Sequence, residues 1–323
     1  MSENIWKDGE YSYEAAYGFI PNLTFYLHED EEVRPFMLVV PGGGYCMVVP
    51  PEGEVVAKEF FSRGMNCAVL TYTTDITCSV PLKHQPLEDI SRAVRYIRKK
   101  LAPEKFVVCG FSAGAHVCGS LGVHYTDVAD PDPALAEVSN RPDAMILSYP
   151  VITSGDYTHN YSMWTLIGRD GPESEYEYFS LEKHVSPDTP PTFLWQTVTD
   201  DLVPVENSQM FAAALRAARV PYAYYAFPAG WHGLSVLNDA FKKGEFGEPY
   251  TMDQVMRAVA AVKAGKGINV SEERRQELIE QFPDDPADRP GPPEGFQAPV
   301  FDDVSKWPEL AMLFLDRVLS PEK

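Results

Sequence analysis

Short apolar runs recur along the chain and are separated by stretches with helical periodicity. The runs with the length of a strand are residues 36–40, 67–72, 106–109, 144–148, 192–196 and 222–227. Short strands without polar alternation are typical of a parallel sheet that is buried on both faces. An earlier run, residues 23–27, alternates apolar and polar side chains and predicts a half-buried antiparallel strand.

Helical periodicity fills the intervals between these runs. The clearest case is residues 88–101, where Ile90, Val94, Ile97 and Leu101 share one face. Further helices are predicted over residues 51–63, from the turn at Ser112 to about residue 124, around residues 210–218 and over residues 305–319. Strands that alternate with helices in this way predict an α/β fold with right-handed crossovers and a mostly parallel central sheet flanked by helices.

Two longer segments interrupt the alternation. Residues 150–191 are irregular and rich in Tyr, Ser and Gly, and a connection of this length inside a compact domain is typically a lid or a binding loop. Residues 236–304 form a helical insert before the last helix, with helix-like stretches at residues 252–264 and 272–282. We expect one domain over residues 1–323, in which the first segment is a loop or cap and the insert is a lid or an interface.

The run at residues 106–109 leads directly into the pentapeptide Gly110-Phe111-Ser112-Ala113-Gly114. A serine on a sharp turn between a strand and a helix has its hydroxyl lifted out of the sheet. The flanking glycines let the two arms of the turn pass close together, and the N-terminus of the next helix points at the group that the hydroxyl attacks. The motif predicts a nucleophile at Ser112.

Two more polar residues follow later strands. Asp200 comes after the run at residues 192–196, and His232 comes after the run at residues 222–227. Because functional loops gather at the carboxyl ends of parallel strands, we expect both side chains near Ser112. The order Ser, Asp, His is that of α/β-hydrolases, in which the imidazole accepts the serine proton and the carboxylate orients the imidazole. The pattern Asp-x-Leu-Val-Pro favours Asp200 as the acid, and Asp201 stays the alternative.

A triple glycine follows the strand at residues 36–40. Its Gly43 and Gly44, together with Ala113, are the candidate N–H donors for an oxyanion that forms when a serine attacks a carbonyl group. Tyr45 and Trp231 neighbour the glycine loop and the histidine. Each of these aromatic side chains either lines the substrate site or packs in the core.

Together these segments resemble the α/β-hydrolase esterase family that includes acetyl-xylan esterase-like and feruloyl esterase-like proteins. The resemblance covers about residues 20–235 and the final helix. Its motifs lie in residues 41–45, 110–116, 148–152, 186–195, 200–207 and 231–234.

The resemblance implies a serine carboxylesterase that needs no cofactor, forms an acyl-enzyme and hydrolyses short-chain esters, often acetyl groups on sugars. It gives the role of nucleophile to Ser112, of base to His232 and of acid to Asp200. The resemblance also gives the role of oxyanion donors to the N–H groups of Gly43, Gly44 and Ala113. The chain departs from one branch of the family, because Pro41 stands where the relatives of hormone-sensitive lipase have a histidine before the glycines. This departure favours a sugar esterase, and the long insert after His232 is a second departure.

Composition and charge narrow the function classes. The formal net charge of −20 argues against nucleic acid and against an anionic membrane surface as partners. No stretch approaches the roughly 20 apolar residues that a membrane helix needs, and the first residues lack the basic start and apolar core of a secretory signal. The five cysteines show no metal-ligand spacing. We expect a cytoplasmic enzyme without a metal, acting on a small-molecule ester such as an acetylated sugar.

Other interpretations remain open at this point. A peptidase or a lipase-like hydrolase of the same fold, or a binding module that has lost its chemistry, also fits parts of the pattern. The absence of an apolar lid helix in residues 150–191 and the intact Ser112, Asp200 and His232 make these interpretations weaker. The acidic insert at residues 236–304 is also compatible with a homo-oligomer.

Overall fold

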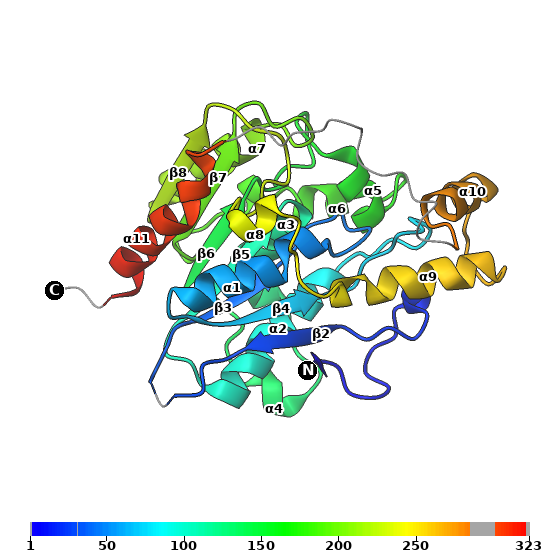
Figure 1. The fold of residues 1–323 in the computed structure, drawn as a ribbon, viewed down its shortest axis with the longest axis horizontal. Coiled ribbons are helices and arrows are strands. Elements are labelled where there is room, and N and C mark those ends of the chain that lie inside the picture. The colour runs from blue at the N-terminus through cyan, green and yellow to red at the C-terminus, as the bar shows by residue number, and fades with distance from the viewer. Residues whose placement is uncertain (1, 31, 285–300, 321–323) are drawn as a thin grey trace.

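A twisted sheet forms the centre of the protein, for which the computed structural model describes residues 2–30, 32–284 and 301–320. Within these residues the sheet has eight strands in the order β1-β2-β4-β3-β5-β6-β7-β8, and the strands from β4 to β8 run parallel (Figure 1). The strands are β1 (Ser2–Asn4), β2 (Asn22–Tyr26), β3 (Phe36–Val40), β4 (Asn66–Thr71), β5 (Phe106–Phe111), β6 (Ala144–Ser148), β7 (Thr192–Thr197) and β8 (Tyr222–Phe227). This is the α/β arrangement that the apolar runs predict.

The pairing of the outer strands follows from their polarity. The alternating run predicted as an antiparallel strand is β2, which pairs antiparallel with β4 on one side and with the short, unpredicted β1 on the other. The strands β3, β5, β6 and β7 are buried throughout, as expected for strands covered on both faces. The last strand, β8, is confirmed at the predicted residues; it is the edge of the sheet and leaves Tyr222 and Tyr225 exposed.

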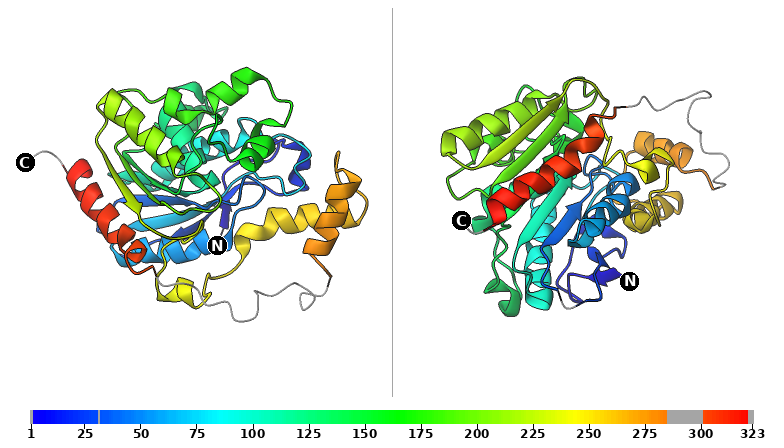
Figure 2. Two further views of the ribbon diagram at one scale, coloured as in Figure 1. Left: turned by 90° about the horizontal axis from the view of Figure 1, so that it is seen from above. Right: turned by 60° about the vertical axis from the view of Figure 1, so that its left-hand side comes forward.

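Helices cover both faces of the sheet. Along β3 the side chains alternate, so that Met37 and Val39 face one layer and Leu38 and Val40 face the other. The first layer holds α1 (Glu54–Ser62) and α11 (Trp307–Leu319), which lie on the same side of the sheet in Figures 1 and 2. The second layer holds α2 (Gln85–Leu101), α3 (Ala113–His124) and α7 (Glu206–Ala218). The short α4 (Pro133–Ala136) lies beside α2.

The segment at residues 150–191 contains more regular structure than its sequence suggests. It includes α5 (Asn160–Ile167) and α6 (Glu173–Tyr178), and it follows β6 at the carboxyl edge of the sheet. The side chains of Met163, Leu166 and Ile167 join the core layer of α2 and α3. The segment is therefore packed onto the domain.

The insert after His232 contains α8 (Asp239–Lys242), α9 (Asp253–Lys263) and α10 (Glu272–Gln281). The two helices predicted in it are α9 and α10; residues 285–300 lie outside the described residues. Both helices lie at the opposite end of the molecule from α11 (Figure 1). A separate apolar cluster joins Val255, Val262 and Leu278 of these helices to Cys46 and Ile76 of the main domain. Within the described ranges, no helix has the length and apolar character needed to cross a membrane.

Candidate active site

Ser112 lies at the turn between β5 and α3, and its backbone adopts φ 51° and ψ −119°. A side chain rarely occupies this conformation, which costs on the order of 1–3 kcal/mol and persists only where the surrounding structure holds it. Two glycines make the turn possible. A Cβ atom on Gly110 would lie 2.4 Å from the carbonyl oxygen of Gly114, and one on Gly114 would lie 2.1 Å from the carbonyl oxygen of Val40. The sequence thus specifies the turn through the absence of side chains on both sides of Ser112.

The structure brings Ser112, His232 and Asp200 into one hydrogen-bonded chain. The Nε2 atom of His232 lies 2.8 Å from the hydroxyl oxygen of Ser112, and its Nδ1 atom lies 2.9 Å from Oδ2 of Asp200. A carboxylate only accepts hydrogen bonds, so Nδ1 carries the proton and Nε2 is free to accept the proton of the serine. The side chain of His232 is 11% exposed and that of Asp200 is 1% exposed. The arrangement suits general-base activation of a serine hydroxyl.

The two neighbouring aspartates contact different atoms of the histidine. Besides the imidazole, Oδ1 of Asp200 accepts hydrogen bonds from the backbone N–H groups of Leu202 and Val203. Burial raises the pKa of Asp200, but the hydrogen bond and charge of His232, with these backbone bonds, outweigh burial and lower the pKa below its usual value. Asp201 instead accepts a hydrogen bond from the backbone N–H of His232, at 2.9 Å. Of the two alternatives left open by the sequence, Asp200 is the one placed against the ring.

The glycine loop after β3 lies directly against the serine. A Cβ atom on Gly42 would be 2.9 Å from Cβ of Ser112. Gly43 and Gly44 have φ angles of 125° and 62°, in the region that favours glycine. Among the described residues, none accepts a hydrogen bond from the N–H of Gly43 or Gly44. Ala113 is the first residue of α3, where backbone N–H groups have no partner within the helix.

A buried carboxylate, which the sequence analysis missed, supports the glycine loop. Oε2 of Glu52 accepts the N–H of Gly42 at 2.7 Å, and Oε1 accepts the hydroxyl of Tyr149 at 2.7 Å. Burial is the main cause that raises the pKa of Glu52, which is 4% exposed. The ring of Tyr149 also meets the imidazole of His232, with 4.8 Å between centroids. In the sequence, Glu52 lies between Pro51 and Gly53, where it has the appearance of an ordinary surface turn residue.

The two aromatic candidates for the substrate site have different positions. The side chain of Tyr45 is 1% exposed and donates a hydrogen bond to Nδ1 of His116, at 2.6 Å, while Nε2 of His116 bonds the carbonyl of Phe179. This burial places Tyr45 in the core and argues against its side chain lining the substrate site. Trp231 is partly buried and packs edge-on against Phe301, with 5.4 Å between ring centroids.

One further histidine lies at the start of α5. His159 precedes α5, and its Nδ1 atom lies 2.8 Å from the hydroxyl oxygen of Ser162. Burial is the main cause that lowers its pKa, and the charges of His232 and Asp200 also act on it. The first turn of α5 borders the glycine loop, because a Cβ atom on Gly44 would lie 3.8 Å from the hydroxyl oxygen of Ser162. Outside the uncertain residues, no cluster of three or more His, Cys, Asp and Glu side chains has the geometry to hold a metal ion.

Comparisons with known proteins identify the family of the chain and several relatives. The model of the BD-FAE family matches residues 23–215. Endo-1,4-beta-xylanase B of Butyrivibrio fibrisolvens is 59% identical over 265 residues, which cover 80% of this chain and 42% of that protein. Esterase LipQ of Mycobacterium tuberculosis is 26% identical over 206 residues, which cover 58% of this chain and 48% of that protein. The chain thus spans about half the length of the curated relatives that it matches.

Solved structures show the same fold. An acetyl ester-xyloside bifunctional hydrolase from Caldicellulosiruptor lactoaceticus has 33% sequence identity and a TM-score of 0.69, and the match covers 83% of this chain and 97% of that one. The carboxylesterase Cest-2923 from Lactobacillus plantarum has 21% identity and a TM-score of 0.63, with 94% of this chain and 95% of that one covered. At that identity the second match speaks for the fold alone.

Proposed function

The chain belongs to the BD-FAE family, and we propose that it hydrolyses carboxylic esters of short acyl groups through Ser112, in particular acetyl esters of small sugars or xylo-oligosaccharides. The observation that carries the proposal is the hydrogen-bonded chain from the hydroxyl of Ser112 through His232 to Asp200. The strained turn that presents the hydroxyl is a second support, because such strain is retained mainly at functional positions.

The proposed reaction has two halves, formation of an acyl-enzyme and its hydrolysis, and the same residues act in both. The hydroxyl oxygen of Ser112 attacks the carbonyl carbon while Nε2 of His232 takes its proton, and Asp200 stabilises the imidazolium that forms. The N–H groups of Gly43, Gly44 and Ala113 stabilise the negative oxygen. The alcohol then leaves with the proton from His232, which gives the acyl-enzyme. A water molecule, deprotonated by His232, attacks the acyl carbon; the bond to Ser112 then breaks, His232 returns the proton to the serine oxygen, and the carboxylic acid is released.

Two relatives support a sugar as the alcohol. The structural relative from Caldicellulosiruptor lactoaceticus is described as an acetyl ester-xyloside bifunctional hydrolase, and the relative from Butyrivibrio fibrisolvens is named as a xylanase. A polar pocket beside α5 supports the same class of alcohol. A cytoplasmic location and assembly into a homo-oligomer through residues 236–304 stay predictions from the sequence, and light scattering of the purified protein measures its oligomeric state.

The test of the proposed function is the variant Ser112→Ala. Since a triad acts as a unit, we expect the turnover of p-nitrophenyl acetate to fall by a factor on the order of 10⁶. Steady-state release of p-nitrophenolate measures this loss, and circular dichroism checks that the variant is folded. A folded variant that keeps a tenth of the wild-type rate refutes the assignment of Ser112.

A further inference from the structure

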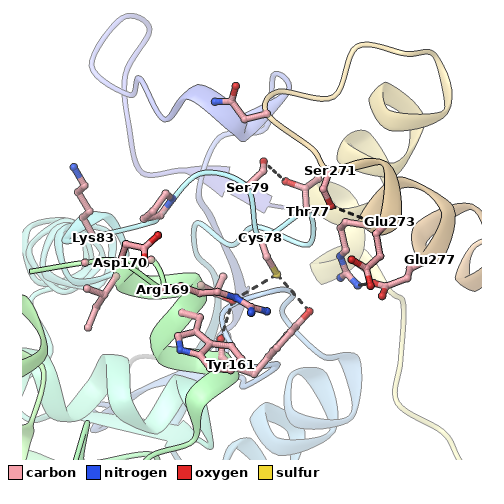
Figure 3. A pocket seen from close by; sticks show the side chains of 18 of the residues that line it. Thr77, Cys78, Ser79, Lys83, Tyr161, Arg169, Asp170, Ser271, Glu273 and Glu277 are labelled. Atoms are coloured by element: carbon pink, nitrogen blue, oxygen red, sulfur yellow. Dashed lines mark hydrogen bonds and ion pairs between the residues drawn. The ribbon is translucent and has the colours of Figure 1, made fainter.

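A pocket of about 800 Å³ lies beside α5, and it has no role in the triad itself (Figure 3). Three separate parts of the chain line it: the loop that contains Cys78, the stretch from Tyr161 to Pro172, and residues of the insert between Asn269 and Glu277. The insert therefore completes a cavity whose other walls belong to the main domain.

The pocket is connected to the active site through α5. The first turn of this helix meets the glycine loop, because a Cβ atom on Gly44 would lie 3.7 Å from Cδ1 of Tyr161 and 3.8 Å from the hydroxyl oxygen of Ser162. Tyr161 lines the pocket, and the whole helix has eight residues, or a length of roughly 12 Å. A ligand bound along this helix would reach the glycine loop at one end and the pocket at the other.

The lining suits a ligand with many hydroxyl groups. Hydroxyl groups, an amide, carboxylates and cationic groups surround the space, while the aliphatic lining is confined to two proline side chains and one isoleucine. Trp164 adds an aromatic surface. Such a mixture offers donors and acceptors on all sides, whereas an acyl chain of a lipid needs a continuous apolar wall.

Among the described residues, two cationic groups of the pocket, those of Lys83 and Arg169, have no hydrogen-bond or ion-pair partner. The guanidinium of Arg169 lies 4.3 Å from the centre of the Trp164 ring, and Figure 3 shows it extending toward Cys78 and Tyr161. Within the described part of the chain, no carboxylate or carbonyl group accepts a hydrogen bond from it. Its donors are therefore available to a ligand.

The insert side of the pocket is fixed to the main domain. The guanidinium of Arg274 donates two hydrogen bonds to the carbonyl of Ile76, at 3.1 and 2.7 Å, and one to Glu277. The hydroxyl of Ser79 donates to the carbonyl of Ile268, at 2.6 Å. Together with the apolar cluster between α9, α10 and the main domain, these bonds hold the insert in place as one wall of the pocket.

We propose that this pocket is the subsite for the saccharide part of the ester, and that Arg169 and Trp164, with the wall supplied by the insert, determine specificity for an oligosaccharide alcohol. The inference rests on the proposed ester hydrolysis at Ser112. The acyl group lies at the serine, and the sugar extends past the glycine loop along α5 into the pocket. A small artificial ester such as p-nitrophenyl acetate does not reach it.

The kinetic test compares two esters. In Arg169→Ala, we expect KM for acetylated xylotetraose to rise about tenfold more than KM for p-nitrophenyl acetate, because a hydrogen bond to a charged group is lost only with the sugar. Trp164→Leu is expected to act in the same direction. The matched control is Arg216→Ala, which removes an exposed arginine of α7 and is expected to change neither constant. Equal changes of KM for both esters in Arg169→Ala overturn the proposal.

A binding test is independent of turnover. Cys78 lines the pocket and is exposed, whereas the four other cysteines are buried. The hydrogen bond from the Cys46 thiol, 3.6 Å away, is the main cause that lowers the pKa of Cys78 below its ordinary value, and we expect its thiolate to react with iodoacetamide. In Ser112→Ala, we expect xylotetraose to slow the alkylation of Cys78, as measured by peptide mass spectrometry. An unchanged rate at saturating xylotetraose overturns the subsite.

The outcomes separate the two proposals. Loss of turnover in Ser112→Ala without any protection of Cys78 leaves the ester hydrolysis standing and removes the subsite. Protection of Cys78 together with an unimpaired Ser112→Ala enzyme supports sugar binding and refutes the proposed catalytic serine. Wild-type protein that hydrolyses p-nitrophenyl acetate but not acetylated xylotetraose overturns the subsite as well.

Discussion

Asp200 and Asp201 are neighbours in the sequence, but they bond to different atoms of the same histidine. The pattern around them favours Asp200, yet the sequence alone leaves both in place, because either carboxylate follows β7 within reach of His232. The structure separates them by burial and by direction. Asp200 lies under the imidazole and Asp201 meets only the backbone N–H.

The first prediction at this scale concerns these two residues. Asp200→Asn is expected to lower kcat for p-nitrophenyl acetate by a factor on the order of 10⁴, because an amide no longer fixes the tautomer and the charge of the imidazole. Asp201→Asn keeps an oxygen that accepts the backbone N–H of His232, and we expect a loss of less than tenfold. A larger loss in Asp201→Asn than in Asp200→Asn would show that the acid is misassigned.

Glu52 is the residue that the sequence could not reveal. Its surroundings become visible only when the chain folds and places it between Gly42 and Tyr149. A carboxylate buried here serves two purposes. It orients the glycine loop, and its negative charge acts on His232, where a positive charge forms during the reaction.

Glu52→Gln removes the charge, and its one amide oxygen can accept only one of the two hydrogen bonds that Glu52 accepts from Gly42 and Tyr149. We expect kcat for p-nitrophenyl acetate to fall about tenfold, which corresponds to about 1.4 kcal/mol. Burial raises the pKa of Glu52 above its usual value. Its ionisation therefore lowers the free energy of unfolding as the pH rises from the usual pKa toward the raised one. Glu88→Gln, on the exposed face of α2, is the control, and a variant with wild-type kcat would argue against the charge effect.

At the scale of elements, apolar periodicity predicted the buried strands and the amphipathic helices well. It failed for α5, because this helix is buried on most sides, including its polar Ser162 and Thr165. A helix without a polar face has no amphipathic signal. The hydroxyl of Ser162 forms a hydrogen bond with His159, and the hydroxyl of Thr165 forms hydrogen bonds with Cys46 and the carbonyl of Tyr161. No local sequence pattern reveals these partners.

His116 connects three elements and gives the prediction at this scale. Its ring lies on α3, accepts the hydroxyl of Tyr45 from the glycine loop, and bonds the carbonyl of Phe179 just after α6. Burial is the main cause that lowers its pKa to about 4. The unfolded chain takes up this proton near pH 6.5 and the folded protein only near pH 4, so stability is full above pH 6.5 and is lost as the pH falls toward 4.

From this difference we expect the free energy of unfolding to lose about 2 kcal/mol between pH 7 and pH 5 through His116 alone. His116→Gln is expected to be less stable than wild type at pH 7, since the packing of three elements changes, but to show a smaller decrease over the same pH interval. Urea unfolding at both pH values measures the two slopes. Equal slopes in the variant and the wild type would exclude His116 as the titrating group.

At the scale of the whole molecule, the sheet explains why the candidate triad could be predicted from the order of strands in the sequence. Parallel strands end at one edge, so Ser112 after β5, Asp200 after β7 and His232 after β8 had to meet there. The pocket could not be predicted in this way. Its walls come from a loop, from α5 and from the insert, and only the packing of α9 and α10 onto Cys46 and Ile76 brings them together.

The central claim is that Ser112 is a nucleophile activated by His232, and covalent labelling tests it most directly. A fluorophosphonate should form one bond between its phosphorus and the hydroxyl oxygen of Ser112, with loss of fluoride, and intact-protein mass spectrometry should find a single adduct per chain. Peptide mapping should place this adduct on Ser112, and neither Ser112→Ala nor His232→Ala should acquire it at a comparable rate. Folded wild-type protein that stays unlabelled, or that carries the adduct on another residue, would contradict the account.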